Sequence, residues 1–214
     1  AAVGGGGAFI SAQAQNTTNS TFVETLFRGN SAKGGETCLI DSSCNILGGA
    51  VYINNANTTF TDCDFYQNEA IAGSSSESTE GGAIYTSTDY LSERLHALNI
   101  VRGTFYGNSA RSTSENGKSG GAGGALCSHG TPVILEDVIF DSNTVGDLSM
   151  LFYDYSSNGG AIYFDGRTRM EVMGGTFASN KAYGGGGGAI YATAFDDLFI
   201  EHASFYNNQA FSSY

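Results

Sequence analysis

The carboxylates of this chain offer a first test for catalysis, because sites that cleave glycosides need two of them on one face. Asp196 and Asp197 are adjacent in sequence, and adjacent residues of a strand point to opposite faces. The segment Ser128-His129-Gly130 brings a hydroxyl and an imidazole, but no matching lysine or arginine motif accompanies it. We therefore predict no catalytic residues and a protein that is not an enzyme.

Histidines and cysteines are the side chains most able to bind a transition metal. His96, His129 and His202 lie in separate segments and share no metal-ligand spacing, which indicates surface side chains. Cys63 and Cys127 lack Cys-x-x-Cys spacing, which favours small buried side chains over a metal or redox role. The sequence thus predicts no metal site and no cofactor. Calcium binding stays open, because neighbouring segments could align carboxylates.

Two kinds of covalent modification remain open. Cys38 and Cys44 lie six residues apart in a polar segment, where a disulfide would close one small loop, and free thiols are an equal alternative. Asn-x-Ser/Thr sequons occur at Asn16, Asn19 and Asn57. With 16 Asn and 42 Ser plus Thr in 214 residues, about three sequons arise by chance, so their number carries no argument.

Composition excludes several classes of protein. The 214 residues include 41% hydrophobic side chains, which is enough for a continuous core. The net charge of −12 disfavours nucleic acid and anionic lipid, because an acidic surface repels both. The sequence has no run of apolar residues long enough for a membrane helix and no basic-then-apolar leader, so we predict no membrane insertion and a mature or trimmed chain.

Two motifs alternate six times along the chain, and the elements that they form must position the candidate side chains. Gly-Gly-Ala followed by a large apolar residue begins at Gly6, Gly48, Gly81, Gly123, Gly159 and Gly187. Phe-x-x-Asn follows each triplet, at Phe27/Asn30, Phe65/Asn68, Phe105/Asn108, Phe140/Asn143, Phe177/Asn180 and Phe205/Asn208. In the first triplet Phe9 takes the place of the aliphatic residue. A regular repeat of this kind predicts a solenoid.

The repeat length predicts the kind of solenoid. The shortest unit, from Gly159 to Gly187, has 28 residues, with period-2 apolar patterns and no helical period. Such a unit, with two or three short strands, is typical of one coil of a parallel β-helix. We predict an all-β fold, a single parallel β-helix domain of six coils over residues 1–214. The six Phe side chains should form an apolar column, and the six Asn side chains an amide ladder that satisfies turn groups.

Four tyrosines recur directly after the triplet segment, at Tyr52, Tyr85, Tyr163 and Tyr191. A row of aromatic rings on a rigid scaffold suits contact with a glycan or a protein partner. Packing of the rings on one another within the stack is the alternative, and the sequence leaves open which face they occupy.

The alternation of GGA[ILV] with FxxN resembles the repeat of the chlamydial polymorphic membrane proteins over nearly the whole chain. The resemblance implies a right-handed parallel β-helix exposed outside the cell, with adhesion as the usual role and no catalytic residues. We therefore expect a non-enzymatic structural or adhesive scaffold, extracellular or on the cell surface. A carbohydrate-active, pectin lyase-like enzyme or a glycan-binding module is the alternative. A host-cell or matrix protein or a glycan remains open as a partner.

The ends of such a β-helix predict self-association. Short segments flank the first and last motifs, so neither terminal coil carries a capping helix. Open strand edges recruit further strands, and a contact from the last coil of one copy to the first coil of the next does not close on itself. We predict a head-to-tail homo-oligomer or filament, or a place within a longer fibre.

Overall fold

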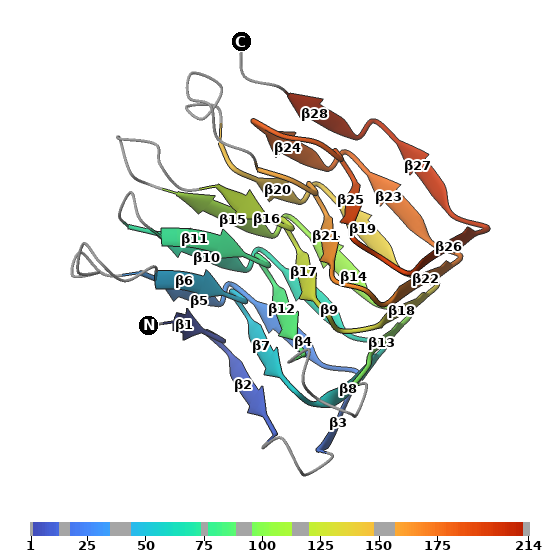
Figure 1. The fold of residues 1–214 in the computed structure, drawn as a ribbon, viewed down its shortest axis with the longest axis horizontal. Helices are drawn as coiled ribbons and strands as arrows, with labels where there is room; N and C mark the ends of the chain where they lie inside the picture. The colour runs from blue at the N-terminus through green and yellow to red at the C-terminus, as the bar shows by residue number, and fades with distance from the viewer. Residues whose placement is uncertain are drawn as a thin grey trace.

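The chain forms a parallel β-helix of six coils (Figure 1). The computed structural model describes residues 2–12, 18–34, 44–73, 77–88, 96–112, 120–147 and 157–211. In these residues each strand pairs in parallel with the equivalent strand of the neighbouring coil, and no helix is long and apolar enough to cross a membrane. The all-β fold predicted from the repeats is confirmed.

The coils stack into five sheets, which we name A to E in chain order. Sheet A contains β1 (Ala2–Gly4), β6 (Cys44–Leu47), β11 (Glu77–Glu80) and β16 (Gly121–Ala122). Sheet B contains β2 (Ala8–Ser11), β7 (Val51–Asn54), β12 (Ile84–Ser87), β17 (Leu126–His129), β21 (Ile162–Asp165) and β25 (Ile190–Thr193). Sheet C contains β3 (Asn19–Val23), β8 (Asn57–Thr61), β13 (Leu98–Val101), β18 (Val133–Glu136), β22 (Arg169–Met173) and β26 (Asp197–Glu201).

The second half of each coil, which carries Phe-x-x-Asn, builds the other two sheets. Sheet D contains β4 (Leu26–Arg28), β9 (Asp64–Tyr66), β14 (Thr104–Tyr106), β19 (Ile139–Asp141), β23 (Thr176–Ala178) and β27 (Ser204–Tyr206). Sheet E contains β5 (Ser31–Lys33), β10 (Glu69–Ala72), β15 (Ser109–Ser112), β20 (Thr144–Val145), β24 (Lys181–Tyr183) and β28 (Gln209–Phe211).

The expectation of two or three strands per coil was too low, because the described coils contain four or five. Sharp bends at single residues divide the chain into strands of only a few residues. In the third coil these bends lie at Gly81, Arg102 and Gly107, with φ of 67°, 51° and 62°. Left-handed backbone at these positions turns the chain without a loop, so the hydrophobic pattern continues across the bend and conceals it.

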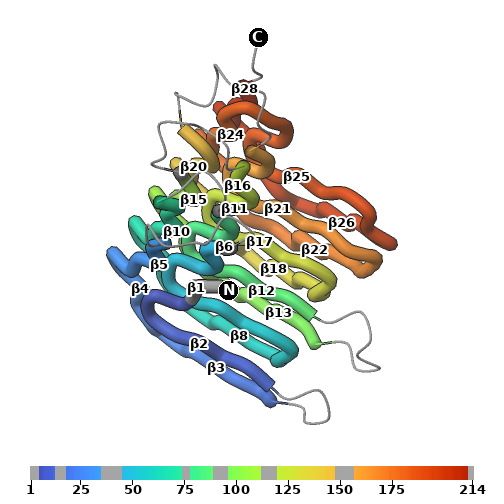
Figure 2. The backbone as a smooth tube through the Cα atoms, turned by 60° about the vertical axis from the view of Figure 1, so that its left-hand side comes forward, coloured from blue at the N-terminus to red at the C-terminus, as the bar shows by residue number. Residues whose placement is uncertain are grey.

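Two apolar cores fill the coils. The larger one lies between sheets B, C and D and contains Val51, Phe60 and Phe65 with their equivalents in other coils. The smaller one lies between sheets A and E and consists of Ile46, Val145 and five alanines. Small side chains suit the space between sheets A and E. Figure 2 shows the coils stacked one on another from the N-terminal end to the C-terminal end.

The predicted Phe column is confirmed and runs through the larger core. Strand register aligns Phe27, Phe65, Phe105, Phe140, Phe177 and Phe205 in that order. Consecutive rings are stacked with centroids 4.4–5.2 Å apart. The four inner phenylalanines are fully buried. This stack is one continuous apolar contact along the β-helix axis.

The predicted Asn ladder is confirmed as well, with Asn30, Asn68, Asn108, Asn143, Asn180 and Asn208 in register. Nδ2 of Asn108 donates to Oδ1 of Asn143 at 2.9 Å, and Nδ2 of Asn143 donates to Oδ1 of Asn180 at 3.0 Å. Each inner Nδ2 also donates to a backbone carbonyl of the preceding coil, as Asn108 does to Phe65 at 2.8 Å. The ladder therefore satisfies buried backbone groups beside the turn.

The first coil differs in phase from the expected motif. Register places Ala8 opposite Val51 and Phe9 opposite Tyr52. Phe9 therefore belongs to the tyrosine column, and its ring lies 5.0 Å from that of Tyr52, rather than replacing an aliphatic core residue. Gly5, with a φ of 68°, takes the role that Gly48 has in the second coil. Only Gly6-Gly7-Ala8 matches the motif in sequence, but the register aligns Gly5-Gly6-Gly7 with Gly48-Gly49-Ala50, so Gly7 stands where the other coils have alanine.

Candidate functional site

The tyrosines that follow the triplets lie on the outer face of sheet B, away from the larger core. Tyr85 is only 8% exposed, since Leu47 of sheet A and Cys127 pack against it. Tyr52 and Tyr163 are half-buried in the same cluster. Burial raises the pKa of the Tyr85 and Tyr163 hydroxyls above the usual range. This location supports packing of the rings on one another, and a binding role for Tyr52, Tyr85, Tyr163 and Tyr191 stays a prediction.

His129 completes this aromatic column where a tyrosine is missing. Register aligns Cys127 with Tyr85 on one side and Tyr163 on the other. The thiol is small, and the imidazole of His129, two residues further along β17, fills the space. The centroid of its ring lies 5.7 Å from that of Tyr85 and 5.5 Å from that of Tyr163. His129 is thereby held between two flat apolar surfaces.

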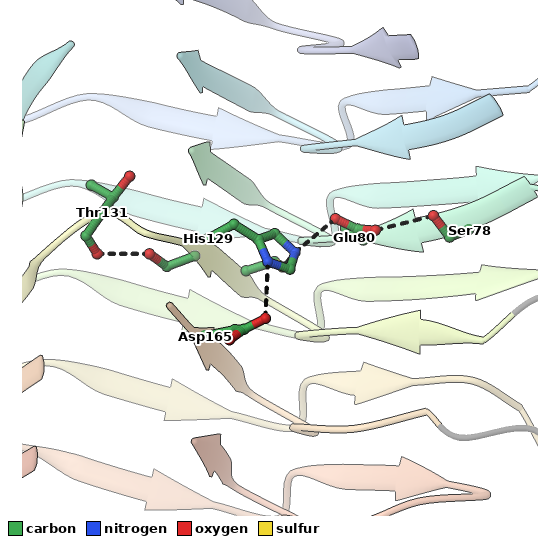
Figure 3. A network of polar contacts seen from close by, with 7 residues as sticks. Ser78, Glu80, His129, Thr131 and Asp165 are labelled. Atoms are coloured by element: carbon green, nitrogen blue, oxygen red, sulfur yellow. Dashed lines mark hydrogen bonds and ion pairs between the residues drawn. The ribbon is translucent and has the colours of Figure 1, made fainter. Parts of the chain in front are cut away.

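Two carboxylates from different coils face this imidazole (Figure 3). Nε2 of His129 lies 3.1 Å from Oε2 of Glu80, and Nδ1 lies 3.6 Å from Oδ2 of Asp165. Burial lowers the pKa of His129, but the hydrogen bond to the carboxylate of Glu80 and the charges of Glu80 and Asp165 outweigh it, so the net shift is upward. The two carboxylates thus fix the ring in one orientation.

Cys127 is the third polar group beside His129. Its Sγ lies 3.4 Å from Nε2 of His129. Burial, together with the charges of Glu80 and Asp165, raises the pKa of this thiol well above its usual range. A cysteine nucleophile needs an accessible thiolate, and Cys127 is fully buried. The cluster of Glu80, Cys127, His129 and Asp165 is therefore not arranged as a cysteine-based catalytic site.

This cluster was not predicted from the sequence, because neither Cys-x-x-Cys spacing nor a pair of histidines marks it. The signal was present as Cys-x-His, because residues two apart in a strand point to the same face. Glu80 was beyond prediction, because it joins the site from sheet A around the Gly-Gly corner. The interpretation of His129 as an ordinary surface side chain was wrong.

The remaining candidate residues lie apart from this cluster. His202 is exposed, as predicted, but His96 is 3% exposed and therefore not on the surface. His96 lies two residues before β13, a position that the adjacent loop composition disguised. Asp196 and Asp197 lie in the exposed last coil, where Asp197 is opposite Arg169.

The predicted modification sites are only partly described. Cys38 and Asn16 lie outside the described residues, as does the side chain of Cys44. Their disulfide and sequon assignments stay predictions. Asn19 and Asn57 lie opposite each other in β3 and β8, and Nδ2 of Asn57 donates to Oδ1 of Asn19 at 3.0 Å. Glycosylation of either residue also stays a prediction.

The two end coils form the other candidate site. Positions that are buried in the inner coils are open at the last coil, where Phe205 is 46% exposed and Phe177 is 0% exposed. Ala189, Ile190, Leu198, Ile200 and Phe205 line an apolar hollow on this end. At the other end Phe22 is only half-buried, whereas the equivalent Phe60 is fully buried. Both ends thus present core positions to solvent.

Fold and repeats together define a parallel β-helix repeat protein. Residues 137–165 match the Chlamydia polymorphic membrane protein repeat family. This segment contains the motif of Phe140 and Asn143 and the following triplet that begins at Gly159, which confirms the resemblance drawn from the motifs. No curated protein and no solved structure matches the chain.

Proposed function

We propose that this chain is a non-enzymatic scaffold module of the cell surface or extracellular space that extends by head-to-tail stacking of its end coils. Surface exposure rests on the match to the Chlamydia polymorphic membrane protein repeat. Stacking rests on the two end faces, whose apolar and polar groups complement each other. The occupant of each end face is a second copy of this chain.

The amide ladder is the main support for stacking, because one of its ends offers a hydrogen-bond donor and the other end offers an acceptor. An inner Nδ2 donates both to the preceding coil and to the Asn of the following coil, as Asn180 does to Phe140 and Asn208. Among the described residues Asn208 makes only the first of these bonds, to the carbonyl of Phe177 at 2.8 Å. At the other end, Oδ1 of Asn30 occupies the position that accepts such a bond in the inner coils. Within the part of the chain that the structure describes, Nδ2 of Asn208 and Oδ1 of Asn30 therefore remain to join two copies.

The apolar side chains of the two end faces also favour stacking of a first coil on a last coil. Stacking would place the first coil of one copy on Phe205 and Ile200 of the next, at the spacing of the inner coils. Burying these side chains and pairing the free strand edges both favour association. The contact is heterologous, because the last coil meets a first coil, and repetition gives a filament.

The test compares self-association of end-face variants by sedimentation velocity and negative-stain microscopy. We expect the parent chain to form concentration-dependent linear oligomers. Phe205→Glu should abolish them, because it places a charge on the end face. Ile139→Glu is the matched control, since Ile139 is 44% exposed against 46% for Phe205 but lies on the outer face of a middle coil. It should assemble like the parent.

The direction of stacking has its own test. Phe22→Glu blocks the first coil, whereas Phe205→Glu blocks the last coil, so each variant retains one open end. A mixture of the two variants should give a dimer and nothing longer, while each alone stays monomeric. A parent chain that is monomeric at its highest soluble concentration would contradict the proposal. So would an Ile139→Glu variant as impaired as Phe205→Glu. Circular dichroism confirms that each variant retains its β-structure.

A second candidate function, glycan binding, is favoured by the outer face of sheet D. Tyr66 and Tyr106 lie there with ring centroids 6.0 Å apart, beside Arg28 and Asp64 in a shallow groove. Exposed aromatic faces next to charged groups suit stacking and hydrogen bonding to a sugar. Tyr106→Ala should lower binding to a glycan array, with Ile139→Ala on the same face as control. An array to which the parent does not bind would exclude this candidate.

A further inference from the structure

Three potential metal ligands converge on the outer face of sheet B. Sγ of Cys127, Nε2 of His129 and a carboxylate oxygen of Glu80 all lie within 4.8 Å of one another. Nε2 is 3.4 Å from Sγ and 3.1 Å from Oε2 of Glu80. Ligand atoms on a tetrahedral zinc ion are about 3.4–3.6 Å apart for the usual Zn–N, Zn–S and Zn–O bond lengths. Small side-chain shifts would bring all three atoms into such a shell.

The carboxylate of Glu80 and the imidazole of His129 each have an orienting partner. Oγ of Ser78 donates to Oε1 of Glu80 at 3.0 Å, which leaves Oε2 directed at His129 (Figure 3). Oδ2 of Asp165 lies 3.6 Å from Nδ1 of His129, which leaves Nε2 directed at Cys127 and Glu80. A carboxylate on the far nitrogen of a histidine is the usual support of a metal-binding imidazole.

An ion pair alone explains only part of this arrangement. It accounts for His129 between two carboxylates, but it does not require sulfur at position 127, where the neighbouring coils have Tyr85 and Tyr163. The small thiol both opens the space for the imidazole and supplies a soft ligand. The rings of Tyr85 and Tyr163 contact the imidazole from the two neighbouring coils and enclose the site on both sides.

We propose that Glu80, Cys127 and His129 bind one zinc-class divalent ion. A thiolate, an imidazole and a carboxylate match the ligand preference of Zn²⁺, whereas Ca²⁺ and Mg²⁺ prefer oxygen alone. Three protein ligands leave a fourth position for water. The side chains of His129 and Asp165 are each 29% exposed, so the ion enters from the solvent side.

Such an ion would link two coils and two sheets. Glu80 ends β11 of the third coil in sheet A, and Cys127 and His129 lie in β17 of the fourth coil in sheet B. Binding would therefore fasten the Gly-Gly corner of one coil to the next coil, and a ligand that binds only the folded chain stabilises it. The site is independent of the proposed stacking, because it lies in the middle coils.

Cobalt(II) is the probe, because it replaces zinc in such sites and absorbs light when bound by a thiolate. The experiment uses the full chain with Cys38→Ser and Cys44→Ser as background, so that those thiols add no signal. We expect one Co²⁺ per chain, with a thiolate-to-metal charge-transfer band and the visible bands of four-coordinate cobalt. Zn²⁺ should displace it stoichiometrically and raise the unfolding temperature.

Matched variants locate the site. Cys127→Ser should remove the charge-transfer band, whereas Cys63→Ser, which changes the other buried free cysteine of the described residues, should retain it. Asp165→Asn should weaken Zn²⁺ binding by about 10- to 100-fold through the orientation of His129. If Cys127→Ser loses its β-structure, Glu80→Gln and His129→Gln provide the comparison, since both side chains are partly exposed. No thiolate band in the background chain, or a band that survives Cys127→Ser, would overturn the proposal.

Discussion

Asn143 and Asn108 are joined by two hydrogen bonds across neighbouring coils. Oδ1 of Asn143 accepts from the backbone N of Asn108 at 3.0 Å and from its Nδ2 at 2.9 Å. Nδ2 of Asn143 in turn donates to the carbonyl of Phe105 at 3.0 Å. Asn143 is fully buried, so water cannot replace these bonds. Its side chain therefore serves as a structural link between coils.

Asn143→Leu should lower the free energy of unfolding by at least about 3 kcal/mol, because each buried group left unpaired costs about 1–3 kcal/mol. Chemical denaturation measures the change. Asn99→Leu is the control, since Asn99 lies on the outer side of sheet C between Thr59 and Ile134. A loss for Asn143→Leu no larger than that of the control would show that the ladder contributes little.

Phe140→Ala should lower the free energy of unfolding by about 3–5 kcal/mol, because it removes a buried ring and leaves a cavity. Its ring lies 4.4 Å from Phe105 and 5.2 Å from Phe177, centroid to centroid. The adjacent Ile139→Ala, at an exposed side chain, should change stability by less than about 0.5 kcal/mol. Equal effects of the two substitutions in denaturant titrations would contradict the inward Phe column.

Gly124→Ala should destabilise the stack by about 1–3 kcal/mol or more, because overpacking forces backbone shifts. A Cβ added at Gly124 would overlap the carbonyl oxygen of Gly160 in the next coil. Gly107→Asn is the control, because the nearest atom to an added Cβ there is Cγ of Gln67 at 3.7 Å, and Asn207 occupies the equivalent left-handed bend of the last coil. A Gly107→Asn control that unfolds at a lower temperature than Gly124→Ala would refute this explanation of the Gly-Gly corner.

Asp62 should titrate below its ordinary pKa of 3.8, because Nε and Nη2 of Arg102 donate to its carboxylate at 2.7 and 2.8 Å. A lowered pKa in the folded state means that the pair contributes stability above the unfolded pKa and loses it as pH falls through the folded value. Arg102→Gln should return the pKa of Asp62 towards 3.8, as measured by NMR titration. The free energy of unfolding at neutral pH should change little, since exposed ion pairs are weak. An unchanged pKa in the variant would remove Arg102 as the cause.

The phase of the first coil and the single-residue bends could not be predicted from the sequence pattern. Phe9 was assigned to the aliphatic position, but pairing with the second coil moved it into the tyrosine column. In the same way, single left-handed residues such as Arg102 and Ser142 divide the coil into short strands. Residues of many types adopt such bends when both flanking strands are paired, so no local composition marks them.

The sequence by itself determined the solenoid, the number of coils and the Phe and Asn columns. It could do so because stacking places equivalent positions directly over one another, which makes periodicity in sequence equal to contact in space. Only the tertiary structure decided which side chains meet across a corner. Glu80 reaches His129 because sheet A folds against the outer face of sheet B, and Cys127 admits the imidazole because its own side chain is small. These contacts join different columns, and the repeat carries no information about them.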